Sequence, residues 1–319
     1  MIMIAVATLL SLVLCLLFGV PYISFLRKKS IGQYILDVAP ESHAQKAGTP
    51  TTGGVFIILA IILSSVVTLL MAEKMDTKAL IILITLFFMT LAGFQDDYLK
   101  IKGKENRGLS PRGKLFRQIL IALIPTLYAM QTYGTIITLG SKSFDIGLLY
   151  PILGVFVITG ASNAYNLTDG LDGLATSVGI PAFLACGIIS FLSGHSVVAI
   201  VCASAIGASI GFLRYNKPKA QVFMGDTGSL ALGGLLGTLA ILGRCELLLA
   251  IYGAVIVAET ISVILQVTSF KLTGKRIFKM APLHHHFERC GHSEVKIVKE
   301  FAIVSLIFAI LAIILFVIL

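Results

Sequence analysis

The sequence predicts an all-α integral membrane protein with about ten transmembrane helices, and three observations lead to this prediction. Of its 319 residues 57% are hydrophobic and 13% are charged, and the mean hydropathy is +0.96. Soluble domains carry about 25% charged residues, so most of this chain requires lipid as its solvent. The apolar residues occur in runs of about 17–25, the length of a helix that crosses a bilayer. Basic residues, the third observation, gather in alternate loops between these runs.

In chain order, the apolar runs predict ten spans within one polytopic domain that covers residues 1–319. The first run ends in Arg27-Lys28-Lys29 and has neither a basic leading segment nor a clear cleavage site, so it is interpreted as a retained span. The spacings Gly207-x-x-x-Gly211 and Gly233-x-x-x-Gly237 are expected to let helices pack closely. The predicted spans are 2–26, 53–72, 79–95, 115–132, 148–163, 174–193, 197–213, 227–243, 247–270 and 299–318.

The distribution of positive charge predicts the orientation. Of the 25 Lys and Arg residues, 21 lie in segments 27–50, 96–117, 214–219 and 271–299. The positive-inside rule places these segments in the cytoplasm and both termini in the periplasm. Basic loops beside lipid attract anionic head groups, so the net charge of +9 does not indicate a nucleic-acid partner. The five cysteines are scattered and indicate neither a disulfide framework nor a thiolate metal site.

Five carboxylates are predicted to converge on the cytoplasmic face. Ionised groups near a bilayer are costly and suggest a functional site, although a single pair could be interface residues that extend toward water. Five of them, interleaved with Gly and Asn, are hard to explain in that way. They are Asp96, Asp97, Asp169, Asp172 and Asp226.

The segment Asp169-Gly170-Leu171-Asp172-Gly173 has two interpretations. An aspartate at the start of an apolar helix could simply accept hydrogen bonds from free helical N–H groups. The polar stretch is longer than a cap needs, because Asn163 and Asn166 add amide groups three residues apart. Such a helix end is suited to base and ribose recognition or to support of a metal ion.

The segment Gly225-Asp226-Thr227-Gly228-Ser229 resembles a phosphate-binding turn. Its glycines permit close approach of the backbone, and the start of the following helix favours anions. A carboxylate beside bound phosphate requires a bridging cation, which points to Mg²⁺. Phe223, three residues before Asp226, could stack on a base or could face lipid.

Basic residues and histidines supply complementary groups. Lys46 precedes the Gly53-Gly54 helix entry, and Arg112 and Lys114 precede the fourth span. Positive-inside bias alone also accounts for such residues. The run His284-His285-His286 is more suited to phosphate binding or proton transfer than to a shared metal, and a solvated loop is the alternative. Glu259, inside the ninth span, is given no role.

These motifs together resemble the phospho-N-acetylmuramoyl-pentapeptide transferases, of the polyprenyl-phosphate sugar-1-phosphate transferase superfamily. The resemblance rests on Asp96-Asp97-Tyr98, 163–174, 224–230, Thr49-Pro-Thr-Thr-Gly-Gly54 and, most specifically, Pro282-Leu-His-His-His-Phe-Glu288. It implies ten helices, a cytoplasmic active site in the bacterial plasma membrane, Mg²⁺ dependence and a homodimer. The implied reaction joins UDP-MurNAc-pentapeptide to undecaprenyl phosphate and releases UMP.

The resemblance also implies roles for individual residues. Asp226 would be the principal Mg²⁺ ligand, with Asp97 close to the metal and Asp96 directed toward the lipid phosphate. His285 joins these three as a candidate catalytic residue. The expected substrate-binding residues are Lys46, Asn166, Asp169, Gly170, Leu171, Asp172, Asn216, Phe223, His284 and His286.

Two other functions remain open at this point. A GlcNAc-1-phosphate transferase of the same superfamily would use the same chemistry on a different sugar. A cation-coupled transporter would also need intramembrane carboxylates, but transporters usually place them near the bilayer midplane. Here the carboxylates are predicted to gather at one face.

Overall fold

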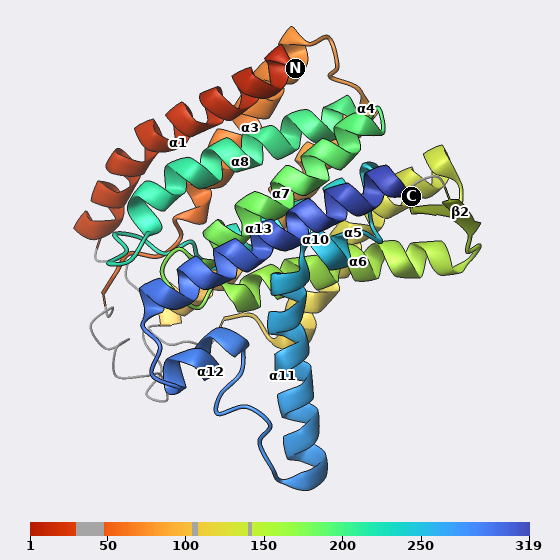
Figure 1. Cartoon of the computed structure of the whole chain (residues 1–319). Coiled ribbons are helices and arrows are strands. Elements are labelled where there is room, and N and C mark those ends of the chain that lie inside the picture. The colour runs from red at the N-terminus through yellow and green to blue at the C-terminus, as the bar shows by residue number, and fades with distance from the viewer. Residues whose placement is uncertain (30–47, 104–107, 140–141) are drawn as a thin grey trace.

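The computed structural model describes residues 1–29, 48–103, 108–139 and 142–319 and is mostly helical. Long helices form a bundle, one helix projects from it, and a short hairpin lies at one edge (Figure 1). The elements in chain order are α1 (Ile2–Lys28), α3 (Gly54–Met71), α4 (Thr77–Gly103), α5 (Pro111–Tyr133), β1 (Ile136–Leu139), β2 (Lys142–Asp145), α6 (Leu149–Thr168), α7 (Leu174–Leu192), α8 (Ser196–Asn216), α9 (Gly225–Leu242), α10 (Leu249–Tyr252), α11 (Ala254–Thr273), α12 (Leu283–Arg289) and α13 (Glu294–Ile318).

Among the described residues, eight helices are long and apolar enough to cross a membrane: α1, α3, α4, α7, α8, α9, α11 and α13. The chain is therefore a multi-pass membrane protein. Helices α5 and α6 coincide with the remaining two predicted spans but are less apolar. Arg117 and Gln118 lie inside α5, and Asn163 and Asn166 lie inside α6.

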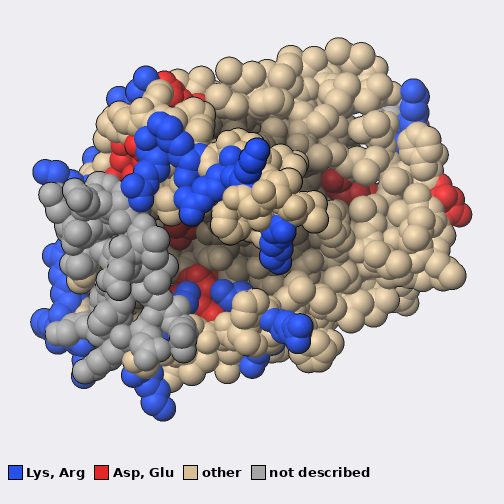
Figure 2. All heavy atoms as spheres, turned by 90° about the horizontal axis from the view of Figure 1, so that it is seen from below, with Lys and Arg blue, Asp and Glu red and all other residues tan. Residues whose placement is uncertain are grey.

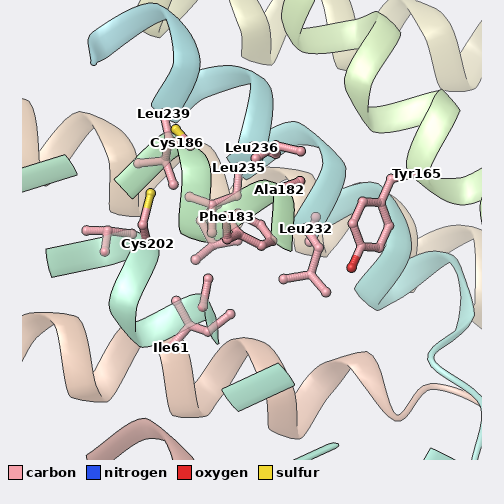
Figure 3. Close-up of a cluster of buried hydrophobic side chains, with 14 of the residues drawn as sticks. Ile61, Tyr165, Ala182, Phe183, Cys186, Cys202, Leu232, Leu235, Leu236 and Leu239 are labelled. Carbon is pink, nitrogen blue, oxygen red and sulfur yellow. The ribbon is translucent and has the colours of Figure 1, made fainter. Parts of the chain in front are cut away.

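Helix α9 is the centre of the bundle. Its candidate span is 94% buried, whereas that of α13 is 17% buried. Helix α9 packs against α4 and α6, α1 packs against α8, and α13 packs against α7. The apolar core brings together side chains from α3, α6, α7, α8 and α9, including Ile61, Phe183 and Leu235 (Figure 3).

The two small-residue spacings have the predicted packing role. A Cβ atom on Gly233 would overlap the Ala161 carbonyl of α6, and one on Gly207 would overlap the Thr8 carbonyl of α1. Gly211 and Gly237 likewise lie against neighbouring helices. These contacts let helix backbones approach more closely than larger side chains would allow.

Three segments differ from the predicted boundaries. Helix α4 does not end at the two aspartates but continues to Gly103. The predicted span 247–270 is interrupted at Gly253, which separates α10 from α11. Helix α11 then projects away from the bundle (Figure 1). The loop 133–147 contains an unpredicted antiparallel hairpin, in which Ile136 pairs with Asp145 and Leu139 with Lys142.

Glu246 lies in the loop between α9 and α10 and is 4% exposed. Burial raises its pKa from the ordinary 4.5 to about 7, although the nearby Arg244 charge opposes the shift. A raised carboxyl pKa stabilises the fold at low pH, and that stability is lost as the pH rises through the folded-state value.

We therefore expect this carboxyl to lower the melting temperature as the pH rises from about 4.5 to about 7, and Glu246→Gln to remove this part of the slope. A shift from 4.5 to about 7 corresponds to at most about 3 kcal/mol. Thermal unfolding in detergent across this pH range measures it. Glu300→Gln, at an exposed carboxyl, is the control, and an identical slope in wild type and Glu246→Gln would contradict the prediction.

Candidate active site

Three buried aspartates meet at the junction of α4 and α9. Asp96 and Asp97 lie in α4, and Asp226 lies in the first turn of α9. One carboxylate oxygen from each lies within 4.8 Å of the others. Gly93 makes this approach possible, because a Cβ atom there would overlap the main chain of Asp226. The sequence therefore brings the two predicted motifs together through a close helix contact.

Asp97 holds the first turn of α9 in place. Its Oδ1 accepts the Asp226 N–H at 3.0 Å, and its Oδ2 accepts both the Thr227 N–H at 2.9 Å and the Thr227 hydroxyl at 2.5 Å. The first N–H groups of a helix lack partners inside the helix and need external acceptors. A carboxylate is also favoured there by the helix dipole. Asp97 thus caps α9 from a different helix.

Asp96 and Asp226 share two lysine side chains. Lys100 Nζ lies 2.6 Å from Asp96 Oδ2 and 3.1 Å from Asp226 Oδ2. Lys114 Nζ lies 2.6 Å from Asp226 Oδ2 and 3.4 Å from Asp96 Oδ1. The Leu109 N–H also donates to Asp96, at 2.8 Å. Two positive charges therefore face three carboxylates.

Polar groups of α6 complete the surroundings of Asp226. The Asn166 side-chain amide donates to Asp226 Oδ1 at 2.9 Å and to the Ser229 hydroxyl at 2.8 Å. One turn earlier, the Asn163 amide donates to Gln118 Oε1. Asn166 therefore lies directly at the acidic cluster, whereas Asn163 supports the contact between α5 and α6.

The acidic cluster can hold a divalent cation. Its donor atoms are carboxylate oxygens within reach of one ion, and hard cations such as Mg²⁺ prefer oxygen ligands with room for water and phosphate. The three aspartates exceed the two lysines by one negative charge, so an additional cation is electrostatically favourable. The residues present therefore fit the metal that the sequence predicts.

The turn before α9 is fastened to the entry of α3. The Gly53 and Gly54 N–H groups donate to the Phe223 and Met224 carbonyls, and the Phe223 N–H donates to the Pro50 carbonyl. Phe223 is half-buried in this turn rather than in a span. Gly225 has φ +70°, a conformation that favours glycine, and a Cβ there would meet the Asp97 carboxylate.

Hydrogen bonds join the segment between α6 and α7 to the 217–224 segment. Asn216 is 2% exposed; it accepts the Gly173 N–H at 3.0 Å and donates to the Val222 carbonyl at 3.0 Å. Asp172 accepts the Ala220 N–H at 2.9 Å. Asn216 and Asp172 therefore hold the α6–α7 connection against the 217–224 segment, and Leu171 is buried in that connection.

Asp169 lies where α6 ends. Burial raises its pKa well above the ordinary value, and the neighbouring Asp226, Asp97 and Asp172 charges raise it further. Two of these charges, Asp226 and Asp97, belong to the acidic cluster, so Asp169 lies within its electrostatic field. A bound cation would lower this pKa by opposing that field.

The three histidines lie on the short helix α12 and have different surroundings. His284 is buried, and a Cβ atom on Gly170 would overlap its imidazole ring. His285 is half-buried and lies 2.7 Å from Glu288. His286 accepts the Lys279 N–H and contacts the Phe278 ring. His284 therefore contacts the 169–173 segment.

Lys46, a predicted substrate-binding residue, lies outside the described residues. Lys100 was not predicted as a site residue, and Lys114 was left without a role. The spacing of Asp96 and Lys100, four residues apart on one helix, is the sequence signal that could have identified the first. Arg112 is exposed at the start of α5.

The face seen from below the view of Figure 1 is hollowed, and basic and acidic atoms lie together within the hollow (Figure 2). Lys and Arg side chains also gather around it on this face. A positively charged rim favours the approach of anionic molecules to this hollow.

Comparison with known proteins identifies the family. The model of glycosyl transferase family 4 matches residues 79–244. A phospho-N-acetylmuramoyl-pentapeptide-transferase of Bacillus licheniformis is 48% identical over 295 residues, which cover 92% of this chain and 91% of the relative. Those of a Geobacillus species and Bacillus subtilis are 45% and 47% identical, and the alignments cover 96% and 91% of each chain, respectively. The chain therefore belongs to the phospho-N-acetylmuramoyl-pentapeptide-transferase family, within glycosyl transferase family 4.

Proposed function

We propose that the protein transfers phospho-MurNAc-pentapeptide from UDP-MurNAc-pentapeptide to undecaprenyl phosphate, forming lipid I and UMP. An oxygen of the lipid phosphate attacks the β-phosphorus of the UDP-sugar. A new phosphoanhydride bond forms as the bond to UMP breaks, and UMP leaves with the electron pair. The observation that carries the proposal is the buried Asp96, Asp97 and Asp226 cluster beside a helix start, in a chain of this family.

Asp226 and Asp97 would hold Mg²⁺, which supplies a Lewis acid and a template for the pyrophosphate. Asp96, which shares both lysines with Asp226, would orient the lipid phosphate. Phosphoryl transfer depends mainly on positioning and on neutralising negative charge. The amino groups of Lys100 and Lys114 lie within 3.4 Å of carboxylate oxygens of both Asp96 and Asp226. The two lysines are therefore placed to bind phosphate oxygens beside these two aspartates.

The segment 169–173 and Phe223 would hold the nucleotide. Asp169, Gly170, Leu171 and Asp172 form the α6–α7 connection, which Asn216 ties to the segment before Phe223. Lys46 and the histidines would contact nucleotide or phosphate groups, with His285 closest to the chemistry. Phe223 is half-buried in a turn outside the helices, which suits stacking on uracil.

The membrane arrangement that fits this role has ten spans, with α5 and α6 as the two less apolar ones. Both termini are then periplasmic and the acidic cluster faces the cytoplasm. In support, α1 and α13 direct the two chain ends to the side of the bundle away from α12 (Figure 1). We also propose that the protein is a homodimer, on the basis of its family alone.

The direct test is UMP release by the purified protein in detergent with undecaprenyl phosphate. Release with UDP-MurNAc-pentapeptide that depends on Mg²⁺ supports the proposal. Preference for UDP-GlcNAc would instead assign the related GlcNAc-1-phosphate activity. Detergent solution has no compartments, so turnover there would exclude cation-coupled transport as the primary function.

Phe223→Ala is expected to weaken binding of the UDP-sugar by about 1–3 kcal/mol, the range for stacking of a base on an aromatic ring. Isothermal titration with UMP and Mg²⁺ measures the loss. Phe223→Tyr keeps the ring and should retain affinity. An unchanged dissociation constant for Phe223→Ala would show that the ring does not contact the nucleotide.

A further inference from the structure

Glu259 is a fully buried carboxyl group in the second turn of the projecting helix α11. Its exposed fraction is 0%, whereas Ile261 and Ile264 on the same helix are 47% and 57% exposed. An ionisable residue within a membrane-crossing helix is costly and is usually retained for a partner. None of the reaction steps above uses Glu259.

The partner of Glu259 is the beginning of α12. The main-chain N–H of His284 donates to Glu259 Oε1 at 3.2 Å. The imidazole Nδ1 of the same residue lies 3.2 Å from Glu259 Oε2. The first N–H groups of a helix need an acceptor from outside the helix. One carboxylate thus contacts both the backbone and the ring of His284.

The opposite edge of the His284 ring faces the α6–α7 connection. A Cβ atom on Gly170 would overlap Nε2 of this ring, so Gly170 leaves the space that the imidazole occupies. Among the described residues Nε2, Nδ1 and Glu259 Oε2 are all buried without a hydrogen bond, so the 3.2 Å approach of Nδ1 to Oε2 is a charge contact rather than an aligned hydrogen bond. The ring also lies against His285, with centroids 4.2 Å apart. His284 therefore connects Glu259 to both the 169–173 segment and the next histidine.

We propose that Glu259 is a positioning residue that fixes the orientation and the tautomer of His284. A carboxylate oxygen 3.2 Å from Nδ1 favours an N–H over a lone pair on that nitrogen by electrostatics, and in the neutral ring Nε2 is then an acceptor directed at the 169–173 segment. The His284 ring, oriented in this way, holds both the 169–173 segment and His285 in place. This role rests on the proposed function only in naming the nucleotide as the ligand of that segment.

Glu259→Gln separates the tautomer effect from a loss of packing. Glutamine has the same length and keeps an oxygen that can accept the His284 N–H. Its amide group presents a donor to Nδ1, so the ring proton is expected to move to Nε2. The matched control is Glu246→Gln, which removes another buried carboxyl at a loop outside the site. Melting temperatures verify that each variant is folded.

The first readout is ¹⁵N magic-angle-spinning NMR of histidine-labelled protein in lipid, with His284→Asn used to assign the resonance. The second is the dissociation constant of UMP with Mg²⁺. We expect Glu259→Gln to move the ring proton of His284 from Nδ1 to Nε2. We also expect it to weaken UMP binding about tenfold, the lower end of the range for loss of a supporting residue. Glu246→Gln should change neither quantity.

An unchanged His284 tautomer together with unchanged UMP affinity in folded Glu259→Gln would overturn the proposal. If Glu259→Gln does not fold, Gly170→Ala displaces the same ring from its other side without removing a charge. A UMP affinity unchanged by Gly170→Ala would then overturn it as well. Failure of wild-type protein to release UMP would count against the proposed function, whereas the tautomer measurement would still decide the role of Glu259.

Discussion

Asp226→Asn is expected to lower turnover at least about 10³-fold, the upper range for losing one electrostatic contribution at an active site. Asp226 is the carboxylate that contacts Lys100, Lys114 and Asn166 at once, so it lies at the centre of the site's charge. Asparagine preserves the shape but removes the charge that attracts a cation. UMP release at saturating Mg²⁺ measures the effect.

The control for this substitution is Asp145→Asn, the same chemical change at an exposed residue of the hairpin. It should leave turnover unchanged. Near-wild-type turnover of Asp226→Asn at saturating Mg²⁺ would remove Asp226 from the proposed metal site.

The second large effect is expected from Asp97→Asn, which should reduce both Mg²⁺ affinity and stability. Both Asp97 oxygens accept hydrogen bonds from the first turn of α9. The side-chain NH₂ group of asparagine would face an N–H or O–H group of the first turn of α9, and that group would lose its acceptor. A buried donor left unpaired costs about 1–3 kcal/mol. Thermal unfolding and Mg²⁺ titration measure the two consequences.

Asp96→Asn is the matched comparison, since the substitution is one residue away on the same helix. It should retain most of the Mg²⁺ affinity and raise the KM for undecaprenyl phosphate instead. Equal loss of Mg²⁺ affinity in the two variants would refute the division between a metal-side and a lipid-side aspartate.

The apolar runs predicted the positions of the long helices because burial in lipid requires apolar length. Their ends were less predictable. Asp96 and Asp97 were expected to close the third span, but α4 continues because Gly93 packs against α9 and Lys100 pairs with Asp96 one turn later. The break at Gly253 lies within a continuous apolar run and has no local signal stronger than the glycine itself.

Within the site, the acidic residues were predictable because carboxylates beside a membrane are costly enough to indicate function. Lys114 was not predictable, because positive-inside bias explains basic residues in that loop equally well. Lys100 was indicated only by its four-residue spacing from Asp96. Their contacts with Asp226 join positions more than a hundred residues apart. Asn216 was predicted to contact the substrate; in the structure both ends of its amide bind the main chain.

For the histidine run as well, contacts with residues distant in the sequence could not be predicted. The sequence favoured phosphate binding or proton transfer over a shared metal site, and the three rings have separate surroundings on α12. The partner of His284 could not be predicted, because Glu259 lies in a different helix and had no recognisable motif around it.

We expect the cluster of Asp96, Asp97 and Asp226 to hold a divalent cation, with Asp226 and Asp97 as its ligands. Mn²⁺ titration of the purified protein, followed by electron paramagnetic resonance, tests it directly. We expect wild-type protein to bind one Mn²⁺ that Mg²⁺ displaces, Asp145→Asn to behave identically, and Asp226→Asn to lose the bound signal. Equal Mn²⁺ binding by wild type and Asp226→Asn, or no binding by wild type, would show that the acidic cluster does not hold a divalent cation through Asp226.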